Sequence, residues 1–174
     1  MQLQAIFNKD IANKRMHIIR EFAAPVPDVW RAWTDSKILD QWWAPKPWRA
    51  ETKSMDFREG GRWLYAMVGP DGTRMYAKME YKKIVKNDFF TSVDGFADEH
   101  GNTVHDFPSM NWNSSFKASA NGTKVEIHIS FDTEADLQKI VELGFQEGFT
   151  AAHQNLDELL ASQAAIGNRP GPGA

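Results

Sequence analysis

The sequence predicts an α+β domain in which a curved antiparallel sheet wraps around a long C-terminal helix. Three observations lead to this prediction. A first strand is followed by two short Trp-rich helices, hydrophobicity then alternates with a period of two over residues 49–131, and an amphipathic segment follows over 133–160. A sheet with one apolar face and a helix with one apolar stripe can bury these surfaces against each other.

The first strand is expected at residues 16–22, and two short helices follow it. Pro25 and Pro27 end the strand, and Pro27 suits the first turn of a helix because the N–H that proline lacks has no partner there. Four tryptophans on these helices are expected to close the open end of the sheet, with one or two of them also reaching a cavity: Trp30, Trp33, Trp42 and Trp43.

About six strands are expected between residues 49 and 131. Gly69–Thr73 is a predicted turn because Pro presets φ and Gly accepts a positive φ. Asn121-Gly122 predicts a tight hairpin between the last two strands. The alternation is clean, which indicates an antiparallel sheet with one face exposed to water.

The last predicted element is one helix over residues 133–160, with a capping-box-like start at Thr133. Gly144 and Gly148 are unexpected in its apolar stripe, since each Gly costs about 1 kcal/mol relative to Ala. Their spacing of four would open room against the sheet. We therefore expect a single domain over residues 1–163 and a flexible tail over 164–174.

Composition excludes several classes of protein. The net charge of -3, without a run of Lys or Arg, argues against a nucleic-acid partner. The sequence has neither an 18-residue apolar stretch nor a signal-peptide pattern. We therefore expect no membrane span, and we expect the protein to be cytoplasmic. The absence of Cys removes disulfides, thiolate nucleophiles and Cys-zinc sites.

Six motifs in this order resemble those of a known family. They are Phe22–Pro25, Val29–Asp35, Leu39–Pro45, Asp56–Gly61, Gly69–Gly72 and Gly144–Phe149. Over about residues 12–161 the chain resembles the helix-grip fold of the START-like (SRPBCC) superfamily, related to Bet v 1. Within it, the chain is similar to the family named for the activator of the heat-shock-protein-90 ATPase.

The resemblance implies a pocket between the sheet and the C-terminal helix. Some members of the superfamily bind lipids, steroids or polyketides, and a few are cyclases or hydrolases. We therefore expect this chain to bind a small hydrophobic or amphipathic molecule, with walls from nine side chains: Trp33, Trp63, Tyr65, Met75, Met79, Trp112, Phe145, Phe149 and, as a polar handle, His153. The alternative is that side chains fill this space.

No catalytic residue, metal site or cofactor is predicted. The most metal-capable segment is Asp94–Asp106, but its spacing matches neither an EF-hand nor a zinc motif, so we interpret it as a solvated loop with a turn at Asp98–Asn102. His128 is expected to face solvent. His153 could serve as a base, but a buried structural His is the commoner case.

Two other functions stay open. A cyclase or hydrolase would use the same cavity and would need an ionisable side chain pointing into it. A co-chaperone or homodimeric module would instead need an exposed apolar patch. The sequence lacks the separate N-terminal domain of the eukaryotic activators, which counts against direct ATPase activation.

Overall fold

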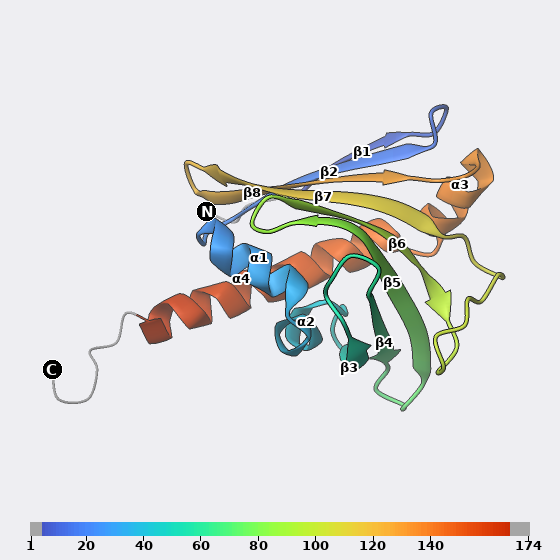
Figure 1. The fold of residues 1–174 in the computed structure, drawn as a ribbon, viewed down its shortest axis with the longest axis horizontal. Coiled ribbons are helices and arrows are strands. Elements are labelled where there is room, and N and C mark those ends of the chain that lie inside the picture. The colour runs from blue at the N-terminus through green and yellow to red at the C-terminus, as the bar shows by residue number, and fades with distance from the viewer. Residues whose placement is uncertain (1–4, 168–174) are drawn as a thin grey trace, which may run out of the picture.

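The computed structural model describes residues 5–167, which form one eight-stranded antiparallel sheet and four helices (Figure 1). The spatial order of the strands is β1-β2-β8-β7-β6-β5-β4-β3. Their bounds are β1 Ile6–Asp10, β2 Arg15–Phe22, β3 Arg49–Met55, β4 Arg62–Val68, β5 Arg74–Val85, β6 Phe89–Ala97, β7 Met110–Ser119 and β8 Gly122–Ser130. Six of these follow the two short helices, as the alternation predicts.

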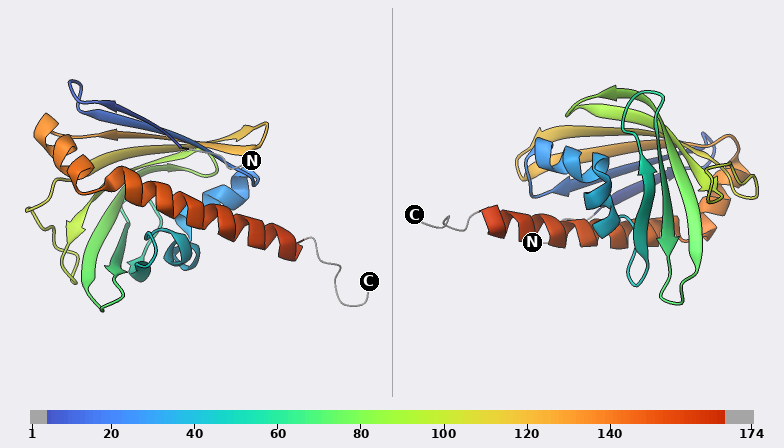
Figure 2. Two further views of the ribbon diagram at one scale, coloured as in Figure 1. Left: turned by 180° about the vertical axis from the view of Figure 1, so that it is seen from behind. Right: turned by 60° about the horizontal axis from the view of Figure 1, so that its bottom comes forward.

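The helices lie on the concave side of the sheet. They are α1 Val26–Thr34, α2 Ser36–Trp42, α3 Glu134–Glu142 and α4 Phe145–Gly167. The long helix α4 crosses the concave face, while α1 and α2 close one end of it (Figures 1 and 2). This arrangement is the predicted helix-grip fold. None of the described helices is long and apolar enough to cross a membrane.

Local chemistry explains where the helices begin. Pro27 lies in the first turn of α1, as predicted. The Asp35 carboxylate accepts a hydrogen bond from the backbone N–H of Lys37 at the start of α2. At the start of α3, the Thr133 hydroxyl accepts one from the backbone N–H of Asp136.

The tryptophans of α1 and α2 are buried at the end of the sheet. Trp30 packs edge-on against Phe116, and Trp33 packs against Trp42 with ring centroids 4.6 Å apart. The Trp42 indole N–H donates to the carbonyl of Ala32 at 3.0 Å, which fixes α2 against α1. Two short helices bury enough apolar area only by carrying such large side chains.

The structure differs from the sequence prediction in three elements. Strand β1 was not predicted; it is a short edge strand with little apolar content, paired only with β2. The predicted single C-terminal helix is broken at Gly144, whose φ of +86° no L-residue adopts without strain. Strand β6 continues through Asp94 to Ala97, where a loop was expected.

The predicted flexible tail begins too early. Helix α4 continues to Gly167, so residues 164–167 are helical. The remainder of the predicted tail, residues 168–174, lies outside the described residues.

Candidate ligand-binding pocket

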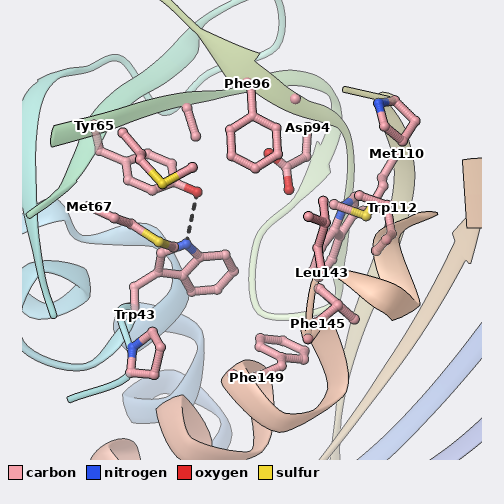
Figure 3. A pocket seen from close by; sticks show the side chains of 18 residues that line it. Trp43, Tyr65, Met67, Asp94, Phe96, Met110, Trp112, Leu143, Phe145 and Phe149 are labelled. Carbon is pink, nitrogen blue, oxygen red and sulfur yellow. Dashed lines mark hydrogen bonds between the residues drawn. The ribbon is translucent and has the colours of Figure 1, made fainter. Parts of the chain in front are cut away.

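A pocket of about 240 Å³ lies between the sheet and the start of α4 (Figure 3). Strands β4, β5, β6 and β7 form one wall, and the α3–α4 junction forms the other. Eighteen residues line it: Trp43, Pro45, Tyr65, Met67, Met75, Ala77, Asp94, Gly95, Phe96, Pro108, Met110, Trp112, Ile140, Leu143, Gly144, Phe145, Gly148 and Phe149.

The wall from the sheet follows from strand register. Tyr65 of β4 lies opposite Ala77 of β5, which lies opposite Phe96 of β6. The methyl group of Ala77 occupies little space between two large aromatic side chains. This alternation of large and small side chains leaves a hollow that three bulky residues in a row would fill.

Gly148 keeps the helical side of the pocket open. A Cβ built on it would meet only the ring of Pro45, at 3.8 Å. A larger side chain here would therefore extend into the pocket. The predicted role of this glycine in making room against the sheet is consistent with its position.

Asp94 supplies the one carboxyl group among the lining residues. It lies on β6, is only 7 % exposed, and receives no hydrogen bond from any side chain within residues 5–167. Burial raises the pKa of Asp94 to about 7, partly offset by a hydrogen bond from the backbone N–H of Gly95. At neutral pH this carboxyl can thus carry or release a proton.

The Tyr65 hydroxyl is the second polar group of the pocket. It accepts a hydrogen bond from the indole N–H of Trp43 at 2.9 Å (Figure 3). Burial, together with the nearby Asp94, raises the pKa of Tyr65 well above its usual value, so this hydroxyl stays neutral. Its own proton remains available to a ligand.

Two lining side chains mark the entrance. Met75 is 40 % exposed and Leu143 is 53 % exposed, whereas most large apolar side chains of the described chain are buried. Met75 lies on β5, and Leu143 lies between α3 and α4. An apolar rim of this kind favours entry of an apolar molecule.

Comparison with known proteins places this geometry in a family. The family model described as "Activator of Hsp90 ATPase homolog 1-like protein" (AHSA1) matches residues 23–161. The chain belongs to the AHSA1 family. A search of curated proteins finds no significant match.

Solved structures of similar proteins agree with this family. Protein Ms6760 from Mycobacterium smegmatis is 30 % identical, with a TM-score of 0.83 over 91 % of this chain and 97 % of that one. A protein from Arthrobacter aurescens is 33 % identical, with a TM-score of 0.84 over 90 % and 91 % of the two chains. The AHSA1 protein from Silicibacter pomeroyi, 19 % identical with a TM-score of 0.66 over 86 % and 99 %, shares the fold.

In this AHSA1 chain, five of the nine residues predicted to contact a ligand line the pocket: Tyr65, Met75, Trp112, Phe145 and Phe149. Trp63, Met79, Trp33 and His153 do not. Trp63 and Met79 lie on the correct face, opposite each other on β4 and β5, but further along the strands. There the helices α1 and α2 already occupy the concave side, so only one half of the face remains hollow.

Trp63 and Trp33 have structural roles. Trp63 stacks on Tyr65, with ring centroids 3.9 Å apart, and donates its indole N–H to the Thr52 hydroxyl at 3.0 Å. Trp33 packs between Phe22 and Phe116. Of the four tryptophans expected at the end of the sheet, Trp43 is the one that reaches the pocket.

His153 is buried one turn beyond the pocket, among aromatic rings. Its ring lies 4.1 Å from that of Phe149, and both ring nitrogens lack a hydrogen-bond partner within the described chain. Burial, together with the charge of Arg20, lowers the pKa of His153 to about 3. The imidazole is therefore neutral, and it is not among the residues that line the pocket.

Sequence reasoning missed Asp94 as a pocket residue. The sequence prediction places it in a polar loop because acidic and His residues follow it, among them Asp98, Glu99 and His100. Only Asp98–Asn102 forms the predicted turn, in which the Asp98 carboxylate accepts backbone hydrogen bonds from His100 and Asn102. The hydrophobic residues on both sides of Asp94 were the available signal that the strand continues.

Proposed function

We propose that this AHSA1 protein binds a small apolar molecule carrying one hydrogen-bond donor, such as a hydroxyl or an amine. The observation that supports this function best is the combination of an apolar cavity of about 240 Å³ with a single carboxyl group, that of Asp94, in its wall. We infer further that the ligand is a cytoplasmic metabolite, in keeping with the expected location of the protein.

The volume limits the size of the ligand. Ligand pockets usually measure roughly 300–1,000 Å³, and an apolar cavity of about 150 Å³ already accepts benzene. A cavity of about 240 Å³ therefore fits a molecule of one or two rings. Complete enclosure of a long lipid chain would require the rim at Met75 and Leu143 to open.

Asp94 favours a donor over an anion. A ligand hydroxyl or ammonium group can donate to the carboxylate, whereas a ligand carboxylate would place a second negative charge in an apolar site. The Tyr65 hydroxyl offers a second partner beside it. The polar end of the ligand is thus expected between β4 and β6, with its rings against Phe145 and Phe149.

A matched series of ligands tests this function. 2-Phenylethylamine, 2-phenylethanol and phenylacetate share one ring and differ in their polar group. Titration followed by two-dimensional NMR is expected to show the amine and the alcohol binding in the pocket, with phenylacetate at least tenfold weaker. Asp94→Asn should reduce the preference for the amine over phenylacetate.

Gly148→Leu is the blocking variant. Its side chain would extend into the pocket, so binding of all three compounds should be lost while the fold is kept. Leu159→Met, a conservative change on the same helix outside the pocket, is the control. If a wider library of one- and two-ring compounds neither binds nor raises the melting temperature of the unaltered protein, the proposal fails.

The same carboxyl supports a second candidate function, general acid–base catalysis. A carboxyl group with a pKa near 7 facing an apolar cavity is the ionisable group that a cyclase or hydrolase needs. Turnover of a bound ligand that stops in Asp94→Asn, with binding retained, would favour the enzyme over the binding protein.

The family name suggests a chaperone partner, and a homodimer is the other protein interaction to consider. The large apolar side chains exposed in the described chain are Ile6, Ile11, Met75, Val85 and Leu143. They are divided among the β1–β2 hairpin, the two ends of β5 and the pocket rim. This distribution favours a small ligand over a protein-docking face.

A further inference from the structure

Three potential metal ligands meet on the outer face of the sheet, away from the pocket. They are His17 of β2 and Glu126 and His128 of β8. His17 lies directly opposite His128 in the register of the two strands, and Glu126 lies two residues before His128, so all three point to the same face. Met16 and Ile18, which flank His17, point inward and are buried.

The ligand atoms of these residues converge. His17 Nε2 lies 2.7 Å from Glu126 Oε2, and His128 Nε2 lies 4.0 Å from the same oxygen. The two imidazole rings stack with centroids 4.2 Å apart and an angle of 11° between their planes. One donor atom from each of the three residues lies within 4.8 Å of the other two.

We propose that His17, Glu126 and His128 bind one divalent transition-metal ion, with Zn²⁺ as the best match. Two imidazole nitrogens and one carboxylate oxygen are among the ligands that Zn²⁺ prefers, and three protein ligands leave a fourth position for water. Mg²⁺ and Ca²⁺ prefer oxygen ligands alone and match this set poorly.

The spacing suits a tetrahedral ion after small movements. With metal–ligand distances of about 2.0–2.1 Å, tetrahedral ligand atoms lie roughly 3.3 Å apart. The observed 2.7 Å and 4.0 Å lie on either side of this value. His128 is 59 % exposed on its side chain, so it can turn toward the ion without disturbing the core.

Two paired strands, β2 and β8, hold the metal-ligand side chains in place. Strands β2 and β8 pair continuously from Arg15–Ser130 to Phe22–Thr123, so the site lies within a long ladder rather than at a frayed end. Residues 17 and 128 are far apart in the sequence, and an ion at this site would join the first part of the sheet to its last strand. Binding should therefore raise the melting temperature.

Calorimetric titration of the untagged full chain, freed of metal with a chelator, tests the proposal with ZnCl₂ and MgCl₂. One Zn²⁺ should bind per chain, and Mg²⁺ should not bind measurably. His128→Ala should weaken Zn²⁺ binding by more than about tenfold, since even groups outside the ligand set change metal affinity by 10–100-fold. Glu126→Gln should weaken it in the same direction.

The double variant His100→Ala/His105→Ala is the matched control, because both residues are exposed histidines in a loop away from the site. It should bind Zn²⁺ as the unaltered chain does. Addition of Zn²⁺ should also shift the imidazole NMR signals of His17 and His128.

Three results would each overturn the proposal. They are no Zn²⁺ binding at one per chain, equal binding by His128→Ala, or loss of binding in the loop control. Binding of 2-phenylethylamine to the pocket should be the same in His128→Ala, which separates failure here from failure of the proposed function.

Discussion

The indole N–H of Trp43 donates to the hydroxyl of Tyr65 at 2.9 Å, and both side chains are almost completely buried. Trp43 directly follows α2 and Tyr65 lies in the middle of β4, so this bond fixes the Trp-rich helices to the wall of the pocket. It also leaves the hydroxyl proton of Tyr65 free beside Asp94. One contact thus serves both the fold and the proposed site.

Tyr65→Phe should destabilise the protein by about 1–3 kcal/mol, because it leaves the buried N–H of Trp43 without a partner. Urea unfolding followed by circular dichroism measures the loss. Tyr76→Phe is the control: Tyr76 is only half-buried and its hydroxyl makes no hydrogen bond to the described residues, so we expect a change within about 0.5 kcal/mol. Equal effects of the two changes would show that the Trp43 bond contributes little.

Asp94→Asn should change how stability depends on pH. The folded-state pKa of Asp94 is about 7 and its ordinary value is 3.8, so between these values the folded chain binds more protons than the unfolded chain. The Asp94 contribution to stability therefore falls as pH rises from about 4 to about 7. Asn imitates the protonated form, and its advantage should grow across this window to at most about 4 kcal/mol.

Urea unfolding between pH 4 and pH 8 measures this difference. Asp98→Asn is the comparison variant, because hydrogen bonds from Asn102 lower the pKa of Asp98. Removal of the Asp98 carboxylate should lower the free energy of unfolding at pH values above the ordinary pKa of Asp. The size of this loss should stay the same between pH 5 and pH 8. If the unaltered chain and Asp94→Asn give parallel pH profiles, the carboxyl of Asp94 titrates at its ordinary pKa.

His153→Met should stabilise the protein at pH 7 by about 1–3 kcal/mol, since it removes two buried nitrogens that have no partner in the described chain. The pKa of His153 is lowered from 6.5 to about 3 in the folded chain. Between about pH 3 and pH 6.5 the unfolded chain therefore binds a proton at His153 that the folded chain does not, so the stability of the unaltered chain falls as pH falls through this range. The advantage of Met should grow over this range, as measured by urea unfolding.

As pH rises, titration of Asp94 lowers the stability of the unaltered chain and titration of His153 raises it, over overlapping pH ranges. The two effects cancel in part between about pH 4 and pH 6.5 in the unaltered chain, so each must be measured as a difference from its own variant. A loss of stability in His153→Met at pH 7 would contradict the prediction and would indicate that the ring nitrogens have partners.

Asp157→Ala should destabilise the protein by about 2–4 kcal/mol. Its carboxylate pairs with Arg20, whose side chain is only 3 % exposed, and removal would leave a buried charge without its partner. Glu158→Ala is the control, since Glu158 pairs with Lys46 at 3.3 Å on the open surface and should contribute at most about 1 kcal/mol. Melting temperatures of the two variants should differ by several degrees; similar values would show that water already screens Arg20.

Much of the fold could be predicted from the sequence, because local chemistry specifies it. The alternation from Trp63 to Phe131 and the proline at the start of α1 favour particular backbone conformations. A hairpin does join β7 to β8, but its loop residues are Ala120 and Asn121, and Gly122 is the first residue of β8. The break in the C-terminal helix could be predicted only in part. A glycine at position 144 permits a positive φ, but the sequence does not show that Gly144 adopts one.

The tertiary structure decided where the face of the sheet is hollow and which polar groups meet. Trp63 and Tyr65 have the same pattern in the sequence, yet only Tyr65 lines the pocket. Trp63 lies toward the end of the sheet that α1 and α2 close, and Trp43, the residue after α2, packs against it. Asp94 faces the pocket, and His17 meets His128, through pairings between residues remote in the sequence. Periodicity determines which face a side chain takes, whereas packing of distant elements determines what that side chain contacts.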